Sequence, residues 1–302
     1  MKIRDIKAYA ISVRVENGAT LAIGRAVKRD SVVVKVTTES GLVGYGESNH
    51  GRSANIIAEI VNTTLKDIVL PASADDVVGV WSKIYEWQLR SHGMGAATAM
   101  AMSGLDMALW DIRAKAAGWP LWKLLGGSNA RKIKAYAGGV ALGWQEPQAL
   151  IDEIAPHVAL GYKAVKLRVG DRTDRDIARV AAVRKAYGDG LTILVDANTG
   201  YGVEDVRRVM PVYEELGVGW LEEPFSPSDH SSYARAAALG KVPLAAGENH
   251  YTRFEFARVL DDGFITILQP DLSKAGGITE VMRIAHTAST WRRPVCPRLL
   301  YT

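Results

Sequence analysis

The stretch GVGWLEEPF, residues 217–225, decides the fold, because an apolar run ends there in two adjacent carboxylates followed by a proline. A buried strand that finishes on two negative charges needs something to compensate them. Two other short apolar runs also end in an acid, and the interval from Asp196 to Glu222 equals that from Glu222 to Glu248. An even repeat that is long enough for one strand and one helix is typical of successive βα units, whose strands form a parallel sheet.

From position 128 onward, short apolar segments alternate with amphipathic ones. We predict strands at 133–139, 164–169, 191–197, 218–223, 242–248, 264–271 and 293–297, separated by amphipathic helices such as 174–188 and 203–217. Repeated βα units form either a (β/α)₈ barrel or a doubly wound sheet. Because no G-x-G-x-x-G motif follows the first strand and no P-loop is present, we predict a barrel of about seven strands.

The segment 1–127 has a different pattern. Residues 1–47 alternate in polarity as strands do, with a turn at residues 39–41, and residues 53–125 are helical. Strands followed by a run of helices predict a separate α+β unit. We therefore predict an α/β protein of two domains, an α+β domain at 1–127 and a barrel domain at 128–302.

Composition and charge exclude several classes of function. The formal net charge is +4, but the basic residues are scattered, so we expect no nucleic-acid partner. Charges at Arg4, Asp5, Lys7 and Arg14 break the N-terminal segment, which resembles neither a signal peptide nor a membrane span. A single cysteine, Cys296, cannot form an intrachain disulfide, which favours the reducing cytoplasm. A basic interior that binds a small carboxylate substrate fits the same numbers.

The evenly spaced acids predict a metal site. Asp196, Glu222 and Glu248 end three consecutive predicted strands and should converge where barrel enzymes have their active sites. Three carboxylates gather only when a cation or protons neutralise them, and oxygen ligands suit Mg²⁺ or Mn²⁺. Each acid alone could be a helix N-cap or a solvated loop residue, but three in phase indicate a metal. Glu223 is then expected to support the ligands or to pair with a cation.

Several basic and polar residues are candidates for the same site. Lys166 and Arg168 lie two positions apart in a predicted strand, so their side chains point to the same side. They could act as a base, as a clamp for a carboxylate, or as ion-pair partners of the acids. His50 and Arg52 follow the N-terminal hairpin and form either a lid or an ordinary polar loop. Together with Asn198 they are the candidate substrate-binding residues.

Six motifs in a fixed order resemble a known family. The segment 101–127 is followed by VKLR, VDAN, LEEP, AGEN and QPDLSKAGGIT, which together resemble the enolase superfamily, specifically its mandelate racemase/muconate lactonizing branch, over nearly the whole chain. The resemblance implies an N-terminal capping domain over a modified barrel, and a homo-oligomer. It also implies that Asp196, Glu222 and Glu248 hold Mg²⁺, which stabilises an enolate.

The resemblance also assigns catalytic roles. Lys166 matches the first lysine of the family's K-x-K motif, and Asp271 matches an aspartate that orients a histidine base on the opposite face. The second lysine, a base, is replaced by Arg168, which keeps its proton. Racemisation needs a group that can transfer a proton on each face of the α-carbon, whereas dehydration can use one histidine on one face. We therefore predict a dehydratase of an aldonic or aldaric acid; a racemase or epimerase, or a non-catalytic binding relative, are the alternatives.

The end of the chain departs from the family pattern. The resemblance calls for a histidine near Arg298 and for an eighth βα unit, but only the segment 298–302 follows Pro297. A barrel without its last unit has open strand edges. We therefore expect this 302-residue chain to be an early-terminated form, incomplete at its C-terminus, with a metal site but little turnover.

Overall fold

The computed structural model of the chain describes residues 1–15, 18, 20–48, 52–93, 95–128, 132–138 and 144–297. Its first part is built on an antiparallel sheet in the order β1-β4-β5. The strands are β1 (Ile3–Arg14), β4 (Lys28–Thr38) and β5 (Val43–Ser48), and β2 (Thr20–Leu21) pairs with β3 (Gly24–Arg25) in a small hairpin. In β4, Val32, Val34 and Val36 are buried, whereas Val33 and Lys35 between them are partly exposed. This alternation is the period of two expected of a strand.

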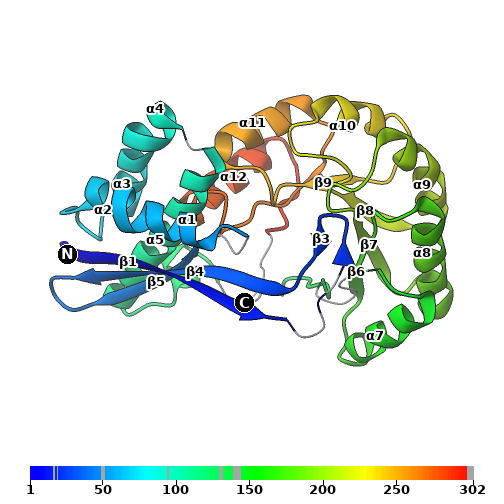
Figure 1. Cartoon of the computed structure of the whole chain (residues 1–302), viewed down its shortest axis with the longest axis horizontal. Helices are drawn as coiled ribbons and strands as arrows, with labels where there is room; N and C mark the ends of the chain where they lie inside the picture. Colours follow the sequence, from blue (N-terminus) through cyan, green and yellow to red (C-terminus); the bar gives the residue numbers. More distant parts are fainter. Residues whose placement is uncertain are drawn as a thin grey trace.

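Helices make up the rest of this part (Figure 1). They are α1 (Ala54–Ile60), the π-helical η1 (Val61–Leu65), α2 (Lys66–Val69), α3 (Val77–Ile84), the π-helical η2 (Tyr85–Leu89), α4 (Arg90–His92), α5 (Gly95–Ala117) and α6 (Leu121–Leu124). The longest helix, α5, lies directly against β5 because two glycines let the backbones meet. A Cβ atom on Gly46 would collide with Gly104 O, and one on Gly44 with Ala108 O. This part is the predicted α+β cap.

The second part is a parallel sheet of five strands in the order β10-β9-β8-β7-β6. The strands are β6 (Ala164–Arg168), β7 (Thr192–Asp196), β8 (Val218–Glu222), β9 (Leu244–Ala246) and β10 (Ile267–Leu268). An arc of helices surrounds them: α7 (Pro147–Ala159), α8 (Thr173–Tyr187), α9 (Val203–Glu215), α10 (His230–Ala237), α11 (Thr252–Asp262) and α12 (Gly277–Thr290) (Figure 1). Because a helix separates each strand from the next, the carboxyl ends of all five strands lie at one edge.

Two parallel bridges extend this sheet at its ends. Ala137 pairs with Val165 of β6, and Val295 pairs with Leu268 of β10. All the predicted strand positions are therefore present among the described residues, the first and the last as single bridges. Prolines flank the last bridge on both sides, and a proline has no N–H to continue a ladder. The predicted modified barrel with an α+β cap is confirmed.

Most buried apolar side chains fall into two clusters, one in each part. The cap cluster includes Ile6, Val34, Trp81, Leu105 and Ile112, and the barrel cluster includes Leu167, Val195, Val206, Leu221 and Phe256. Helix α5 of the cap packs against α12 of the barrel. At this contact Thr279 N donates a hydrogen bond to Asp106 Oδ2 at 2.9 Å. The two parts are thus joined by a polar contact as well as by packing.

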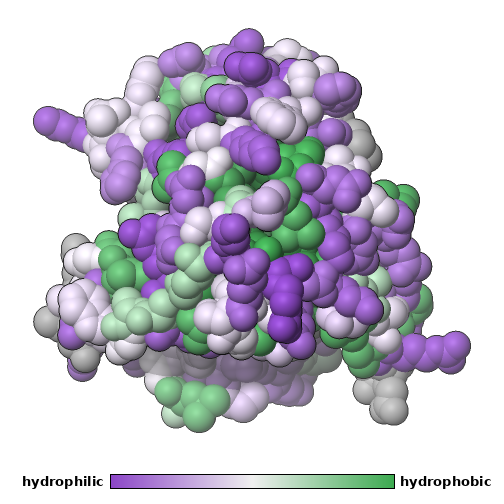
Figure 2. All heavy atoms as spheres, turned by 90° about the vertical axis from the view of Figure 1, so that its left-hand side faces the viewer, coloured by the Kyte–Doolittle hydropathy of each residue, from purple (hydrophilic) through white to green (hydrophobic). Residues whose placement is uncertain are grey.

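The surface on the side of the cap is mostly polar, with small apolar areas between the polar side chains (Figure 2). On β1, Tyr9, Ile11 and Val13 are exposed, whereas Ile6 and Ala8 point to the other side and are buried. Within the described ranges, no helix has both the length and the apolar character needed to cross a membrane.

Asp106→Asn tests the burial of the acid between α5 and α12. Burial raises the pKa of Asp106 from 3.8 to about 7. The folded protein therefore keeps a proton that the unfolded chain loses as the pH rises from about 4 to about 7, and stability falls over that window. Asparagine has no such titration. We expect the melting temperature of the variant, relative to wild type, to rise between about pH 4 and about pH 7; a pH-independent difference would contradict the raised pKa.

Candidate active site at the carboxyl ends of the barrel strands

Four charged side chains singled out by the sequence lie side by side on three neighbouring strands. Lys166 and Arg168 belong to β6, Asp196 is the last residue of β7, and Glu222 is the last residue of β8. Arg168 pairs in register with Asp196, and Asp196 pairs with Glu222. All four residues are at most 7 % exposed. The parallel register therefore brings these charges to one level of the sheet, away from water.

Both cations bind the acids. Lys166 Nζ lies 2.9 Å from Asp196 Oδ2 and 2.7 Å from Glu222 Oε1, and Arg168 donates to the same Asp196 Oδ2. Arg168 also lies 3.2 Å from the side-chain oxygen of Asn198. Burial acts to lower the pKa of Lys166, but the charges of Asp196 and Glu222 outweigh it and raise that pKa above its usual value. The arrangement is the ion-pair alternative considered for these two cations.

The second oxygen of Glu222 is held by two groups that sequence reasoning did not single out. Gln269 Nε2 donates to Glu222 Oε2 at 2.9 Å, and Trp220 Nε1 donates to the same oxygen at 3.2 Å. Gln269 directly follows β10, so its side chain reaches the site from the other end of the sheet. Its place at a strand end, just before Pro270, was the available signal in the sequence.

Glu223 turns away from Glu222. Its φ of 37° places it in the left-handed region, and Asn249 Nδ2 donates to Glu223 Oε2 at 2.8 Å. Behind Asn249 stands Lys274, whose Nζ lies 3.3 Å from Asn249 Oδ1. Burial raises the pKa of Glu223 to about 7, and the neighbouring negative charges of Asp196 and Glu222 add to the effect. Glu223 is therefore hydrogen-bonded by the side-chain amide of Asn249, and Lys274 in turn contacts that amide.

Asp271 and Lys274 form a second polar group after β10. Ser273 donates to Asp271 Oδ1 through its backbone N at 2.8 Å and its hydroxyl at 2.7 Å. Asp271 Oδ2 is buried and accepts no hydrogen bond within the described part of the chain. Burial raises the pKa of Asp271 and lowers that of Lys274, each against the charge of the other. Lys274 is a candidate that the sequence analysis missed, although it lies shortly after Asp271 in the QPDLSKAGG motif.

The side chains do not stand as an assembled metal site. Glu248 is 6 % exposed and follows Gly247, just beyond the end of β9. Across the described ranges, no group of three or more His, Cys, Asp or Glu side chains is arranged to hold a metal ion. Lys166 Nζ lies between Asp196 and Glu222 and contacts both carboxylates. The convergence of all three acids on one ion therefore stays a prediction.

The charge balance of the site nevertheless fits a divalent cation. Five carboxyl groups here are buried, those of Asp196, Glu222, Glu223, Glu248 and Asp271. Within the described part of the chain, the buried cations among them are Lys166, Arg168 and Lys274. If all these groups are ionised, the site carries two excess negative charges. Burial raises the pKa of Glu223, and the negative charges of Asp196 and Glu222 raise it further. The donors are all oxygens, which suits Mg²⁺.

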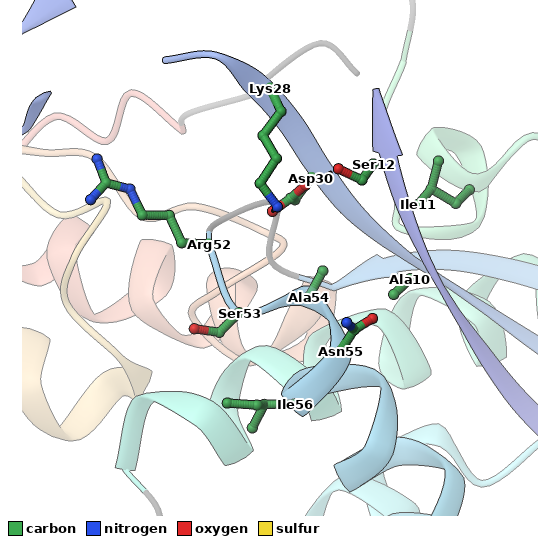
Figure 3. Close-up of a pocket in the computed structure, with 10 residues that line it drawn as sticks. All are labelled: Ala10, Ile11, Ser12, Lys28, Asp30, Arg52, Ser53, Ala54, Asn55 and Ile56. Carbon is green, nitrogen blue, oxygen red and sulfur yellow. Dashed lines mark hydrogen bonds and ion pairs between the residues drawn. The ribbon is translucent and has the colours of Figure 1, made fainter. Parts of the chain in front are cut away.

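The two candidates from the cap have different outcomes. His50 lies outside the described residues. Arg52 donates to Ile23 O of the hairpin turn at 2.8 Å. It also lines a cavity of about 300 Å³ in the cap, but its guanidinium points away from the Lys28–Asp30 ion pair there (Figure 3). The observed partner of Arg52 is thus the backbone of the cap hairpin.

Comparison with known proteins assigns both parts of the chain to families. Residues 5–126 match the family described as mandelate racemase / muconate lactonizing enzyme, N-terminal domain, and residues 149–301 match the enolase C-terminal domain-like family. Arabinonate dehydratase of Saccharolobus solfataricus is 34% identical over 98% of this chain and 80% of its own length.

Solved structures resemble the whole described chain. An enolase-superfamily member from Polaromonas sp. JS666 has a TM-score of 0.96 at 50% identity, over 99% of this chain and 79% of that one. A racemase from Streptomyces coelicolor A3(2) with bound magnesium has a TM-score of 0.93 at 27% identity, over 99% of this chain and 84% of that one.

Lys166→Met tests the buried ion pairs directly. The variant leaves Asp196 and Glu222 without the ammonium that bridges them, and breaking a buried pair in this way costs about 3–5 kcal/mol. Urea unfolding in EDTA should show this loss near neutral pH. Lys163→Met, shortly before β6 at an exposed position, is the matched control and should change little. Equal effects of the two variants would show that the bridge does not stabilise the fold.

Proposed function

The chain belongs to the mandelate racemase/muconate lactonizing enzyme family of the enolase superfamily, and from that premise we propose that it is a Mg²⁺-dependent dehydratase of a sugar acid. The reaction removes the proton α to the carboxylate and then expels the β-hydroxyl as water. The observation that carries the proposal is that, among the described residues of the site, five buried carboxyl groups stand against three buried cations. A divalent cation compensates that charge, and an enolate formed from a carboxylate needs such an ion.

Asp196, Glu222 and Glu248 are the residues that would hold Mg²⁺. When bound, the ion supplies positive charge to the substrate carboxylate as the α-carbon loses its proton. Lys166, which contacts both Asp196 and Glu222, adds a second positive charge at the same place. Because these groups are excluded from water, their charges act on the substrate more strongly than exposed ones would.

The two sides of the site have different chemistry. Arg168 stays protonated and binds Asp196 and Asn198, so its side offers an anchor rather than a base. Asp271, after the strand at the other end of the sheet, has an oxygen available to orient a base. The histidine that the family pattern places near Arg298 is not in this sequence, whose residues 298–302 are RLLYT.

A site with one proton-transferring side favours dehydration over racemisation. The base takes the α-proton and returns it to the departing β-hydroxyl, so one water leaves and the enol rearranges to a 2-keto-3-deoxy acid. The likeness to an arabinonate dehydratase supports an aldonic or aldaric acid as the substrate.

A racemase or epimerase of a hydroxy- or amino-acid derivative is the alternative. One observation favours it: Lys274 is buried beside Asp271, and burial lowers its pKa. A lysine of this kind is a better base than Arg168 and lies beyond β10, at the opposite end of the sheet from Lys166. The likeness to a racemase structure supports the same reading.

Three further properties complete the proposal. We place the boundary between the cap domain, 1–127, and the barrel domain, 128–302, after the last cap helix. The lone Cys296 supports a reducing cytoplasmic location. A homo-oligomer and a small carboxylate substrate, without nucleic acid, follow the family resemblance and the scattered charges.

Incubation with Mg²⁺ and a panel of aldonic and aldaric acids tests the reaction. We expect mass spectrometry to show a small amount of a product lighter by one water molecule, with solvent deuterium incorporated when D₂O is used. EDTA and the Lys166→Met variant should both abolish this product. Deuterium at the α-carbon without loss of water would identify the epimerase instead. If neither dehydration nor α-carbon exchange occurs, the remaining alternative is a non-catalytic binding relative.

Glu222→Gln tests the metal ligands. Mg²⁺ at about 100 times its dissociation constant should stabilise wild type by about 2.7 kcal/mol and raise its melting temperature. The variant should show a much smaller rise, because a neutral amide is a poorer ligand for a hard cation. Glu215→Gln, at an exposed position on α9, should behave as wild type. An undiminished Mg²⁺ response of Glu222→Gln would remove Glu222 from the ligand set.

A further inference from the structure

The first turn of α12 is held by side chains from α5 of the cap. Gly276 N donates to Ser103 Oγ at 2.9 Å, and Thr279 N donates to Asp106 Oδ2 at 2.9 Å. These are N–H groups at the start of a helix, which have no partner within the helix itself. The cap helix therefore supplies the N-terminal capping groups of a barrel helix that lies far later in the chain.

Two tryptophans of the cap bind the same turn. Trp81 Nε1 donates to Gly276 O at 3.0 Å, and Trp110 Nε1 donates to Thr279 Oγ1 at 2.9 Å. The guanidinium of Arg283, on α12, lies 4.5 Å from the ring centre of Trp81. The position of this turn relative to the cap is thus fixed by donors, acceptors and stacking together.

The sequence at the turn permits this close approach only because it has two glycines. Gly276 and Gly277 have φ values of 113° and 83°, in the region that favours glycine. A Cβ atom on Gly277 would collide with the carboxylate of Asp106. The acid and the glycine therefore form one fitted contact between the cap and the barrel.

The turn is coupled directly to the candidate active site. Lys274 N and Ala275 N donate to Asp271 O at 3.1 and 2.8 Å, so residues 271–275 form a single compact turn. Thr252 N donates to Ala275 O at 3.2 Å and holds that turn from the β9–α11 side. Because Gly276 follows without any intervening residue, a displacement of Gly276 moves Asp271 and Lys274 as well.

We propose that Ser103 and Asp106 are positioning residues of the active site, through which the cap sets the placement of Asp271 and Lys274. This inference rests on the proposed function, since Asp271 and Lys274 act on the side of the site where protons are transferred. A small misplacement there is costly, because a shift of about 1 Å in a reacting group reduces turnover by about 10²-fold. The cap is thereby part of the proton-transfer machinery and not a cover alone.

Asp106→Ala and Ser103→Ala test the proposal. Each removes one capping acceptor, and we expect kcat to fall by about tenfold or more with little change in KM. Asp106→Asn keeps an oxygen for Thr279 N and should restore kcat close to wild type. Asp111→Ala is the matched control: Asp111 lies on the same helix but accepts from Tyr45 N and Lys115, away from α12.

Hydrogen exchange supplies a readout that does not depend on turnover. In both alanine variants we expect faster exchange in residues 271–275 as well as in 276–282, and no change in Asp111→Ala. Faster exchange confined to 276–282, or no change in either segment, overturns the coupling. Faster exchange throughout with kcat unchanged overturns the positioning role, as does an equal loss of kcat in Asp111→Ala.

Failure of the proposed function is distinguishable from failure of this inference. If wild type turns over no sugar acid and exchanges no α-proton, the proposed function fails. The exchange of residues 271–275 in the alanine variants then still decides whether α5 positions the turn that carries Asp271 and Lys274.

Discussion

Buried negative charge is the constraint on which the rest of this structure depends. Several carboxyl groups lie at the strand ends, where little water reaches them, and removing one ion from water costs several kcal/mol. Lys166 compensates Asp196 and Glu222 together, because its ammonium lies between them. Glu223 responds in the other possible way, by a raised affinity for a proton. The charge that neither route neutralises is the physical basis of the proposed cation site.

The fold delivers these groups to one place through register. Parallel strands joined by helices of similar length bring residues at the same point of each βα unit to the same level, so Arg168, Asp196 and Glu222 stand in adjacent rows. The turn after β10 has no such ladder to fix it. Thr252 N of the barrel donates to Ala275 O in this turn, and Ser103 and Asp106 on α5 of the cap accept from Gly276 N and Thr279 N directly after it. The barrel thus positions the acids, and the contact with the cap positions the remaining side of the site.

The same distinction explains how much the sequence could predict. The even spacing of acids predicted the neighbourhood of Asp196 and Glu222, since register follows from the length of the repeated unit. It could not show that Glu223 adopts a φ of 37° and turns towards Asn249, because the pattern of apolar and polar residues does not reveal a backbone in the left-handed region. Nor could it show which cation lies between the acids, because ion pairing depends on side-chain geometry. Lys274 was missed because the side chains of a loop do not alternate in a regular pattern, so the sequence does not show which way they point.

The groups on β6 and the groups on the turn after β10 differ in how firmly they hold their protons, and this difference assigns them different roles in the proposed reaction. On the β6 side, Arg168 keeps its proton and the acids raise the pKa of Lys166, so both cations remain charged. On the β10 side, burial raises the pKa of Asp271 and lowers that of Lys274, which brings the two closer to neutral pH. The permanent positive charges therefore lie on β6, and the proton transfers that we propose take place at the turn after β10. A site divided in this way stabilises an anion on one side while protons are exchanged on the other.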